Sequence, residues 1–242
     1  MKKSDSPRFT LAMPTYNEEG NIQAVLEESI GHLERMGEPW EIIVIDNAST
    51  DRTREKVLAL VAREPRLRLV SHESNRLYSG SCQTALQEVR GDILAIMDSD
   101  GQFTIKDLPK FIRELEGGAS LVFGWRRVRH DPLARKVISM VFNLMGKLML
   151  KFPFHDLNCG IRVMDRRSIQ SISVRHPINM ANPEFFVRAR LAKLKMSEVP
   201  IEHAARQHGQ TSHNLFRLWG IFLAVYRYFR TLSQELNTKG SL

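Results

Sequence analysis

Residues 93–102 read Ile-Leu-Ala-Ile-Met-Asp-Ser-Asp-Gly-Gln, and this stretch decides the fold class. Its first five residues form a short apolar run, which predicts a buried strand. The run ends at Asp98, and Asp100 and Gln102 follow at intervals of two residues. Ligands of open α/β sheets bind at the carboxyl ends of the strands. We therefore expect a binding site directly after this strand.

Strands and helices alternate on both sides of this stretch. Segments with helical periodicity, such as the one that carries Ile22, Val25, Leu26 and Ile30, separate short apolar runs. The alternation predicts an α/β fold with a mostly parallel sheet and helices on both faces. The expected strands are residues 9–14, 41–46, 68–70, 92–97 and 120–124.

The composition excludes several classes of protein. The 242 residues are 43% hydrophobic, which is too apolar for a disordered chain. Cys82 and Cys159 are the only cysteines, so a disulfide framework and a Cys-x-x-Cys metal site are both excluded. The first residues lack the apolar run of a signal peptide, which predicts a cytoplasmic location. No stretch approaches the roughly 18–20 apolar residues that span a bilayer.

The charge is distributed unevenly along the chain. The formal net charge is +8, but residues 1–125 carry −5 and residues 126–242 carry +13. The second half therefore favours an anionic partner. Nucleic acid, an anionic membrane surface and a phosphorylated substrate all fit this field, so charge alone does not choose among them.

Polar clusters follow three of the expected strands: residues 14–18, 46–51 and 98–102. In the last cluster, two carboxylates and an amide oxygen can converge on one divalent cation, although an Asp-x-Asp pair alone is as often a solvated turn. The first strand is followed by neither a Gly-x-Gly-x-x-Gly turn nor a Walker-type loop. A dinucleotide-binding dehydrogenase is therefore excluded.

From about Leu11 to Ser212, these motifs resemble glycosyltransferase family 2, and within it the polyprenyl-phosphate sugar synthases similar to dolichol-phosphate mannose synthase. The resemblance implies a Rossmann-like GT-A fold. It also implies a catalytic domain over residues 1–212 and a C-terminal extension of amphipathic helix over residues 213–242.

The resemblance assigns a donor side to the site. Asn47 replaces the family's usual second aspartate, and Leu77 stands where glycine is usual. Asp98, Asp100 and Gln102 match the metal and diphosphate motif, which implies Mg²⁺ or Mn²⁺ as cofactor. The implied ligands of the GDP- or UDP-linked sugar are Pro14, Tyr16, Glu18, Asp46, Asp98, Asp100, Gln102 and Arg206, the last from a His-x-x-Arg signature that begins at His203.

The resemblance also assigns an acceptor side. Arg126, Arg135 and Ser139 match the residues that hold an acceptor phosphate, and Ser139 lies one helical turn after Arg135. The implied catalytic residues are Asp100, Arg126, Arg135, Ser139 and Asp156.

The implied reaction moves a sugar, with inversion, to a dolichyl or undecaprenyl phosphate. An anionic phosphate acceptor needs no general base, whereas a hydroxyl acceptor would need one, with Asp156 or Glu184 as candidates. A family 2 enzyme with a hydroxyl acceptor and a nucleotidyltransferase remain alternatives. A non-catalytic module that binds membranes or nucleic acid is opposed by the three clusters, and we expect no nucleic-acid partner.

The composition of two segments predicts how the protein would associate with a membrane. Residues 133–152 and 215–228 combine bulky apolar residues with lysine and arginine, which favours helices in a membrane interface over helices in the core. We expect a peripheral protein on the inner face of a membrane. A membrane-anchoring protein is a further expected partner.

Overall fold

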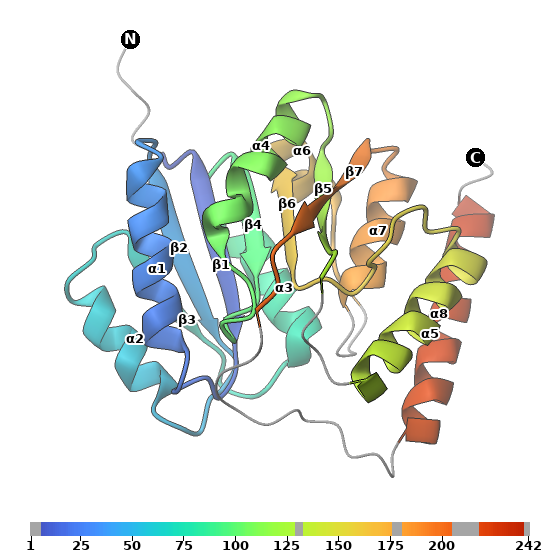
Figure 1. Cartoon of the computed structure of the whole chain (residues 1–242), viewed down its shortest axis with the longest axis horizontal. Helices are drawn as coiled ribbons and strands as arrows, with labels where there is room; N and C mark the ends of the chain where they lie inside the picture. Colours follow the sequence, from blue (N-terminus) through green and yellow to red (C-terminus); the bar gives the residue numbers. More distant parts are fainter. Residues whose placement is uncertain (1–5, 129–132, 176–180, 205–217, 240–242) are drawn as a thin grey trace.

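A seven-stranded sheet forms the centre of the computed structural model, which describes residues 6–128, 133–175, 181–204 and 218–239. Its order is β3-β2-β1-β4-β6-β5-β7, and β6 alone runs antiparallel to its neighbours (Figure 1). The mostly parallel sheet is therefore confirmed. The strands are β1 (Phe9–Thr15), β2 (Trp40–Asp46), β3 (Leu67–Ser71), β4 (Ile93–Met97), β5 (Leu121–Arg126), β6 (Ile161–Asp165) and β7 (Met196–Ile201).

Helices cover both faces of the sheet, each over its own apolar core. One face carries α1 (Ile22–Arg35), α2 (Thr53–Val61), the 3-10 turn η1 (Ile105–Asp107) and α4 (Leu108–Glu116). The other face carries α3 (Leu77–Glu88), α5 (Leu133–Leu150), α6 (Arg166–Ser171), α7 (Ala181–Leu191) and α8 (Leu218–Lys239).

All five strands predicted from the sequence are present, but β6 and β7 were not predicted. All seven residues of β1 and of β2 are buried, as expected for central strands that helices cover on both faces. Helix α3 begins at Leu77, two residues after Asn75, which binds Asn47 directly after β2. The first turn of α3 therefore lies beside the end of β2.

The strand order determines where the site lies. Strand β1 pairs in parallel with β2 on one side and with β4 on the other. Helix α1 leaves β1 over one face, whereas α3 enters β4 from the opposite face. The chain therefore switches faces beside β1, and ligands of open α/β sheets bind at the carboxyl ends of the strands at such a switch point. All three polar clusters lie at this edge, the lower edge of the sheet in Figure 1.

Helices α5 and α8 lie side by side beyond the edge of the sheet that β7 forms (Figure 1). Val225, Tyr228, Phe229 and Leu232 of α8 are buried in the core that α5 and α7 share. Phe229 meets Phe142 of α5 edge to face, with ring centroids 5.2 Å apart. Within the described residues, neither these helices nor any other is long and apolar enough to cross a membrane.

Candidate active site

Hydrogen bonds join the loops after β1 and β2 into one rim. The backbone N–H of Asn17 donates to Ser49 Oγ at 3.0 Å, and Asn17 Oδ1 accepts from the backbone N–H of Thr50 at 2.8 Å. The backbone N–H of Glu18 donates to Thr53 Oγ1 at 2.8 Å. Asn17 and Ala48 have positive φ values of 54° and 63°, so both loops turn sharply at the contact.

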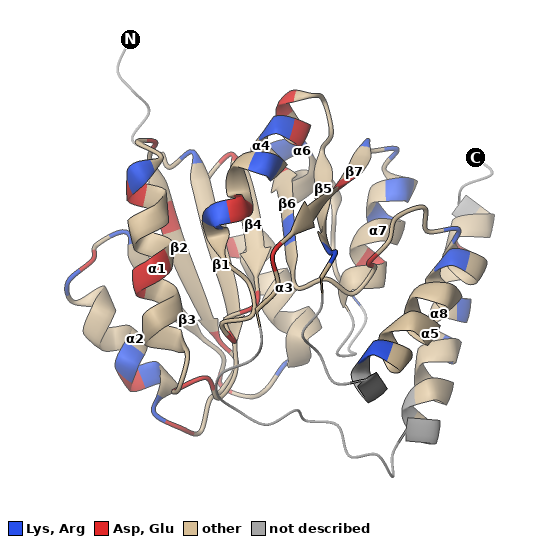
Figure 2. Ribbon diagram, in the orientation of Figure 1, with Lys and Arg blue, Asp and Glu red and all other residues tan. Residues whose placement is uncertain are grey.

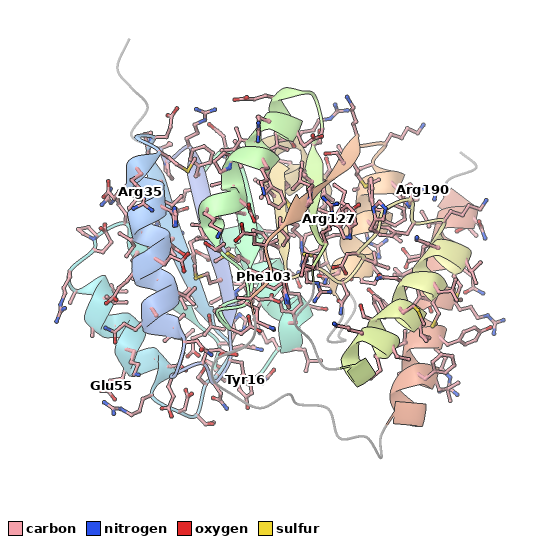
Figure 3. All side chains as sticks on the ribbon, viewed as in Figure 1. Tyr16, Arg35, Glu55, Phe103, Arg127 and Arg190 are labelled. Carbon is pink, nitrogen blue, oxygen red and sulfur yellow. The ribbon has the colours of Figure 1, made fainter. Side chains whose placement is uncertain are left out.

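The residues predicted to hold the nucleotide are brought together on this rim. Pro14, one residue before the end of β1, pairs with Ile45, and Asp46, the last residue of β2, pairs with Thr15. Tyr16 is exposed at the lower edge of the sheet (Figure 3). Glu18 is buried, and its carboxylate accepts from Asn21 Nδ2 at 2.7 Å.

Asn47 is buried and lies at the centre of a partly buried polar network. Its Nδ2 donates to Asn75 Oδ1 at 2.9 Å, and its Oδ1 accepts from the backbone N–H of Arg76 at 2.8 Å. Asn47 Oδ1 also lies 2.9 Å from His72 Nδ1. Burial and the charge of Arg76 lower the pKa of His72, so the neutral Nδ1–H tautomer donates to Asn47. The network requires an amide at position 47, because an aspartate could not donate to Asn75.

Leu77 has a positive φ of 59°, although it is not a glycine. Its backbone N–H donates to Asn75 Oδ1 at 2.8 Å, which fixes this turn. The left-handed backbone that the family's glycine would favour is therefore retained here with a leucine, at some cost in strain.

The Asp-x-Asp turn lies next to the first-strand motif. Ser99 Oγ donates to the carbonyl of Pro14 at 3.1 Å. Asp100 Oδ1 accepts from the backbone N–H of Gln102 at 3.1 Å, and Gly101 between them has a φ of 76°. The turn thus places Asp98, Asp100 and Gln102 beside the rim formed by the loops after β1 and β2, as expected from the strand ends.

The carboxylate of Asp98 is held in a nearly dry environment. Burial, followed by the negative charge of Asp100, raises its pKa to about 7, while Arg162 and a hydrogen bond from Tyr78 oppose the rise. Within the described part of the chain, Asp98 Oδ1 is buried without a hydrogen-bond partner.

These residues fit a divalent cation. A cation would supply the partner that Oδ1 of Asp98 lacks among the described residues, and two carboxylates with an amide form a hard oxygen donor set. No group of three or more His, Cys, Asp or Glu side chains with metal-binding geometry occurs in the described ranges. Because Mg²⁺-type sites complete their coordination with water and substrate phosphates, two protein carboxylates are sufficient.

Gln102 connects the Asp-x-Asp turn to residue 204. The backbone N–H of Ala204 donates to the Gln102 carbonyl at 2.9 Å, and Gln102 Nε2 donates to the Ala204 carbonyl at 3.4 Å. His203 is buried edge to face against Phe103, with ring centroids 5.3 Å apart. Arg206, predicted to bind the diphosphate, lies outside the described residues.

On the acceptor side, Arg126 and Asp156 pair with each other. Arg126 Nε donates to Asp156 Oδ2 at 2.7 Å, and Nη2 donates to Oδ1 at 2.9 Å. Nη2 also donates to the carbonyl of Asn158 at 3.1 Å. The two residues were predicted to serve different tasks, and the structure joins them in one buried ion pair.

The other predicted acceptor residues lie on or near α5. Ser139 is buried in the helix, one turn after Arg135, whose side chain lies outside the described part. Glu184, the second candidate base, is fully buried at the start of α7. Its Oε1 accepts from Arg188 Nη2 at 3.0 Å and from the backbone N–H of Arg175 at 2.9 Å.

Sequence reasoning assigned no role to two residues beside Asp98. Arg162 of β6 and Tyr78 of α3 both contact its surroundings. An arginine inside the apolar run of residues 161–164 is a signal that could have identified Arg162. For Tyr78 the sequence offers no comparable signal.

The family model described as glycosyl transferase family 2 matches residues 10–173, which include β1 to β6. The chain belongs to glycosyl transferase family 2. This family 2 chain is 28% identical over 221 residues to a dodecaprenyl-phosphate galacturonate synthase of Rhizobium johnstonii. It is 26% identical over 216 residues to an undecaprenyl-phosphate 4-deoxy-4-formamido-L-arabinose transferase of Pectobacterium carotovorum. The alignments cover 90% and 88% of the chain, but only 65% of each relative.

Solved structures of glycosyltransferases share the fold of this family 2 chain. A glucosyl-3-phosphoglycerate synthase of Mycobacterium tuberculosis, in complex with Mn²⁺, UDP-glucose and phosphoglyceric acid, matches with a TM-score of 0.73 at 18% identity, over 94% of this chain and 80% of that one. A mannosyltransferase of Pyrobaculum calidifontis, in complex with GDP-mannose and Mn²⁺, matches with a TM-score of 0.60 at 20% identity, over 91% and 62%. The expected GT-A fold is confirmed.

Proposed function

We propose that this family 2 chain transfers a sugar from a nucleoside diphosphate sugar to a polyprenyl phosphate at a membrane surface. The observation that carries the proposal is the alignment of nearly the whole chain with two transferases named for dodecaprenyl and undecaprenyl phosphate acceptors. The relatives are longer than this chain, so their activities enter as support for a proposal. UDP- and GDP-linked sugars are both candidate donors, because each occurs in a solved structure of this fold.

The geometry of the donor side supports the proposal. Asp98, Asp100 and Gln102 would hold a divalent cation, with either Mg²⁺ or Mn²⁺ suited to the oxygen donors. When bound, the cation would neutralise the charge that develops on the departing diphosphate. Pro14, Tyr16, Glu18 and Asp46 would orient the nucleotide on the rim, and Arg206 would contact the diphosphate.

The acceptor side favours a phosphate over a hydroxyl. A hydroxyl acceptor requires a base, and both carboxylates considered for that role are engaged by arginines. Both oxygens of Asp156 accept hydrogen bonds from Arg126, and Glu184 accepts from Arg188. A phosphate acceptor is already anionic at neutral pH and needs no base. Arg135 and Ser139 would orient the attacking oxygen.

The surface of α5 and α8 supports action at a membrane. We call the side chains that these helices leave exposed the apolar face: Val137, Ile138, Met140, Val141, Leu144 and Leu148 of α5, and Phe222, Leu223 and Tyr226 of α8. Leu148 is 73% exposed and Met140 63%. Lysines and arginines border this face (Figure 2), and they would attract anionic lipid headgroups. The arrangement is typical of helices that lie in a membrane interface.

A transfer assay with separate donor and acceptor arms tests the proposal. The purified chain is incubated with UDP- or GDP-linked sugars, Mn²⁺ and either undecaprenyl phosphate or undecaprenol. We expect product from the phosphate and none from the alcohol, and no product with EDTA. Arg135→Ala should reduce transfer strongly while donor affinity stays nearly unchanged, and Arg206→Ala should weaken donor binding.

Two outcomes would overturn the proposal. Equal transfer to the alcohol would favour the hydroxyl-acceptor reading, in which a base is required. Equal stabilisation of the protein by UDP or GDP with and without divalent metal would remove the metal from the mechanism.

A further inference from the structure

Arg162 is a fully buried cation without an ion pair to any carboxylate among the described residues. Its Nη2 donates to the hydroxyl of Tyr78 and to the carbonyl of Cys159, both at 3.1 Å. Its Cζ lies 4.8 Å from the centroid of the Phe185 ring. Burying a guanidinium without a directly paired anion is costly, so the position requires an explanation.

Tyr78 connects this cation to Asp98. The Tyr78 hydroxyl accepts from Arg162 and donates to the Asp98 carboxylate. A directed chain of hydrogen bonds therefore runs from Arg162 through Tyr78 to the predicted metal ligand.

The backbone leaves the Asp98 side chain little freedom. The backbone N–H of Asp98 donates to the Gly160 carbonyl at 3.2 Å, where β4 meets β6. A Cβ at position 160 would overlap an oxygen of Asp98 and the ring of Phe103, so only glycine fits there. One side of the carboxylate is thus packed against backbone, Tyr78 binds it, and Oδ1 stays buried without a partner in the described ranges.

We propose that Tyr78 and Arg162 are positioning residues that hold the Asp98 carboxylate in the orientation for binding a divalent cation. The inference rests on the metal site of the proposed function. Hydrogen bonds to a metal ligand fix its orientation and tune its basicity, and their loss weakens metal binding. Arg162 also supplies positive charge behind a site in which Asp98 and Asp100 approach each other.

Tyr78 also lies next to the loop that follows β2. Tyr78 follows Leu77 directly, and the turn at Leu77 is fixed by Asn75, which in turn binds Asn47 at the end of β2. Tyr78 therefore forms a hydrogen bond with the Asp98 carboxylate and also continues the loop that lies beside the residues predicted to bind the nucleotide.

Mn²⁺ binding tests the proposal directly, with the metal as probe. Mn²⁺ is titrated into the wild-type chain by electron paramagnetic resonance, with and without UDP or GDP, and compared with Tyr78→Phe, Arg162→Lys and the control Tyr226→Phe on exposed α8. We expect Tyr78→Phe to weaken Mn²⁺ binding about tenfold. Arg162→Lys should have a smaller effect, because lysine keeps the charge but lacks the planar fork. Tyr226→Phe should bind Mn²⁺ like the wild type.

Thermal unfolding without metal separates positioning from folding. Tyr78→Phe should still unfold in one cooperative transition, with a Tm about 3–10 °C below that of the wild type, because the ring is conserved but a hydrogen bond to the buried Arg162 is lost. Wild-type Mn²⁺ affinity in Tyr78→Phe would overturn this inference alone. If Tyr78→Phe does not fold, unchanged Mn²⁺ affinity in Arg162→Lys would overturn it. Absence of Mn²⁺ binding by the wild type would overturn the metal site and this inference together, whereas failure to glycosylate undecaprenyl phosphate would overturn only the acceptor assignment.

Discussion

Arg126 and Asp156 form a buried two-point contact, with Nε 2.7 Å from Oδ2 and Nη2 2.9 Å from Oδ1, across 30 positions of the chain. The contact ties the end of β5 to the loop before β6. Both side chains are less than 10% exposed. Asp156→Ala should therefore lower the free energy of unfolding by about 3–5 kcal/mol, because it removes the carboxylate that neutralises the charge of a buried arginine.

Thermal or urea unfolding measures this loss. The double variant Arg126→Met with Asp156→Leu should lose less than the sum of the two single variants, since it removes both charges. A single variant Asp156→Ala with wild-type stability would contradict the ion pair.

The raised pKa of Asp98 predicts how metal binding depends on pH. With a pKa of about 7, Asp98 is protonated at lower pH, and the proton competes with the cation. Mn²⁺ affinity should thus rise about tenfold per pH unit from pH 5.5 to 7 and level off above pH 8. Titrations across this range, monitored by electron paramagnetic resonance, check the prediction, and a flat profile would count against it.

Leu77→Gly should stabilise the protein. The residue has a φ of 59°, its side chain is 39% exposed, and glycine adopts this backbone without strain. The relief is worth about 1 kcal/mol, or roughly 2–4 °C in Tm. Leu77→Ala is the matched control and should bring no gain, because alanine retains the Cβ. A lower Tm for Leu77→Gly than for the wild type would contradict the prediction that the positive φ of Leu77 destabilises the fold.

Asn47→Asp should destabilise the rim, even though aspartate is usual at this position in the family. A carboxylate would face Asn75 Oδ1 at the present 2.9 Å contact and could not donate to it. We expect a loss of about 1–3 kcal/mol at pH 8, measured by urea unfolding. Adding Asn75→Ser should recover part of the loss, because it removes the opposing carbonyl oxygen. If adding Asn75→Ser recovers no stability, the loss does not come from repulsion between residue 47 and Asn75 Oδ1.

The apolar face should bind anionic vesicles. Leu144→Ser with Leu148→Ser should reduce sedimentation with phosphatidylglycerol vesicles about tenfold and leave Tm unchanged, since both side chains are exposed. Phe229→Ser, in the buried side of α8, is the contrasting variant and should destabilise the fold. Wild-type sedimentation of the α5 variant would exclude this face as the lipid contact.

Local patterns in the sequence were enough to predict the parallel part of the sheet and the edge where the site lies. Parallel strands end at one edge, so three polar clusters after three apolar runs had to converge there. Strand β6 was missed because Arg162 interrupts its short apolar run. The partner of Arg126 and the contact between Tyr78 and Asp98 could not be predicted, since they depend on tertiary contacts between distant segments.

The antiparallel strand β6 also constrains how the protein folds. It lies between β4 and β5, although it follows both of them in the chain and is separated from β5 by the 18-residue helix α5. The two halves of the sheet therefore cannot join until β6 has been synthesised and inserted. Gly160 and Arg162 reach Asp98 only at that step, across about 60 residues of chain. Because such non-local pairings are slow to form, we expect the metal-binding edge to be among the last parts of the molecule to become ordered.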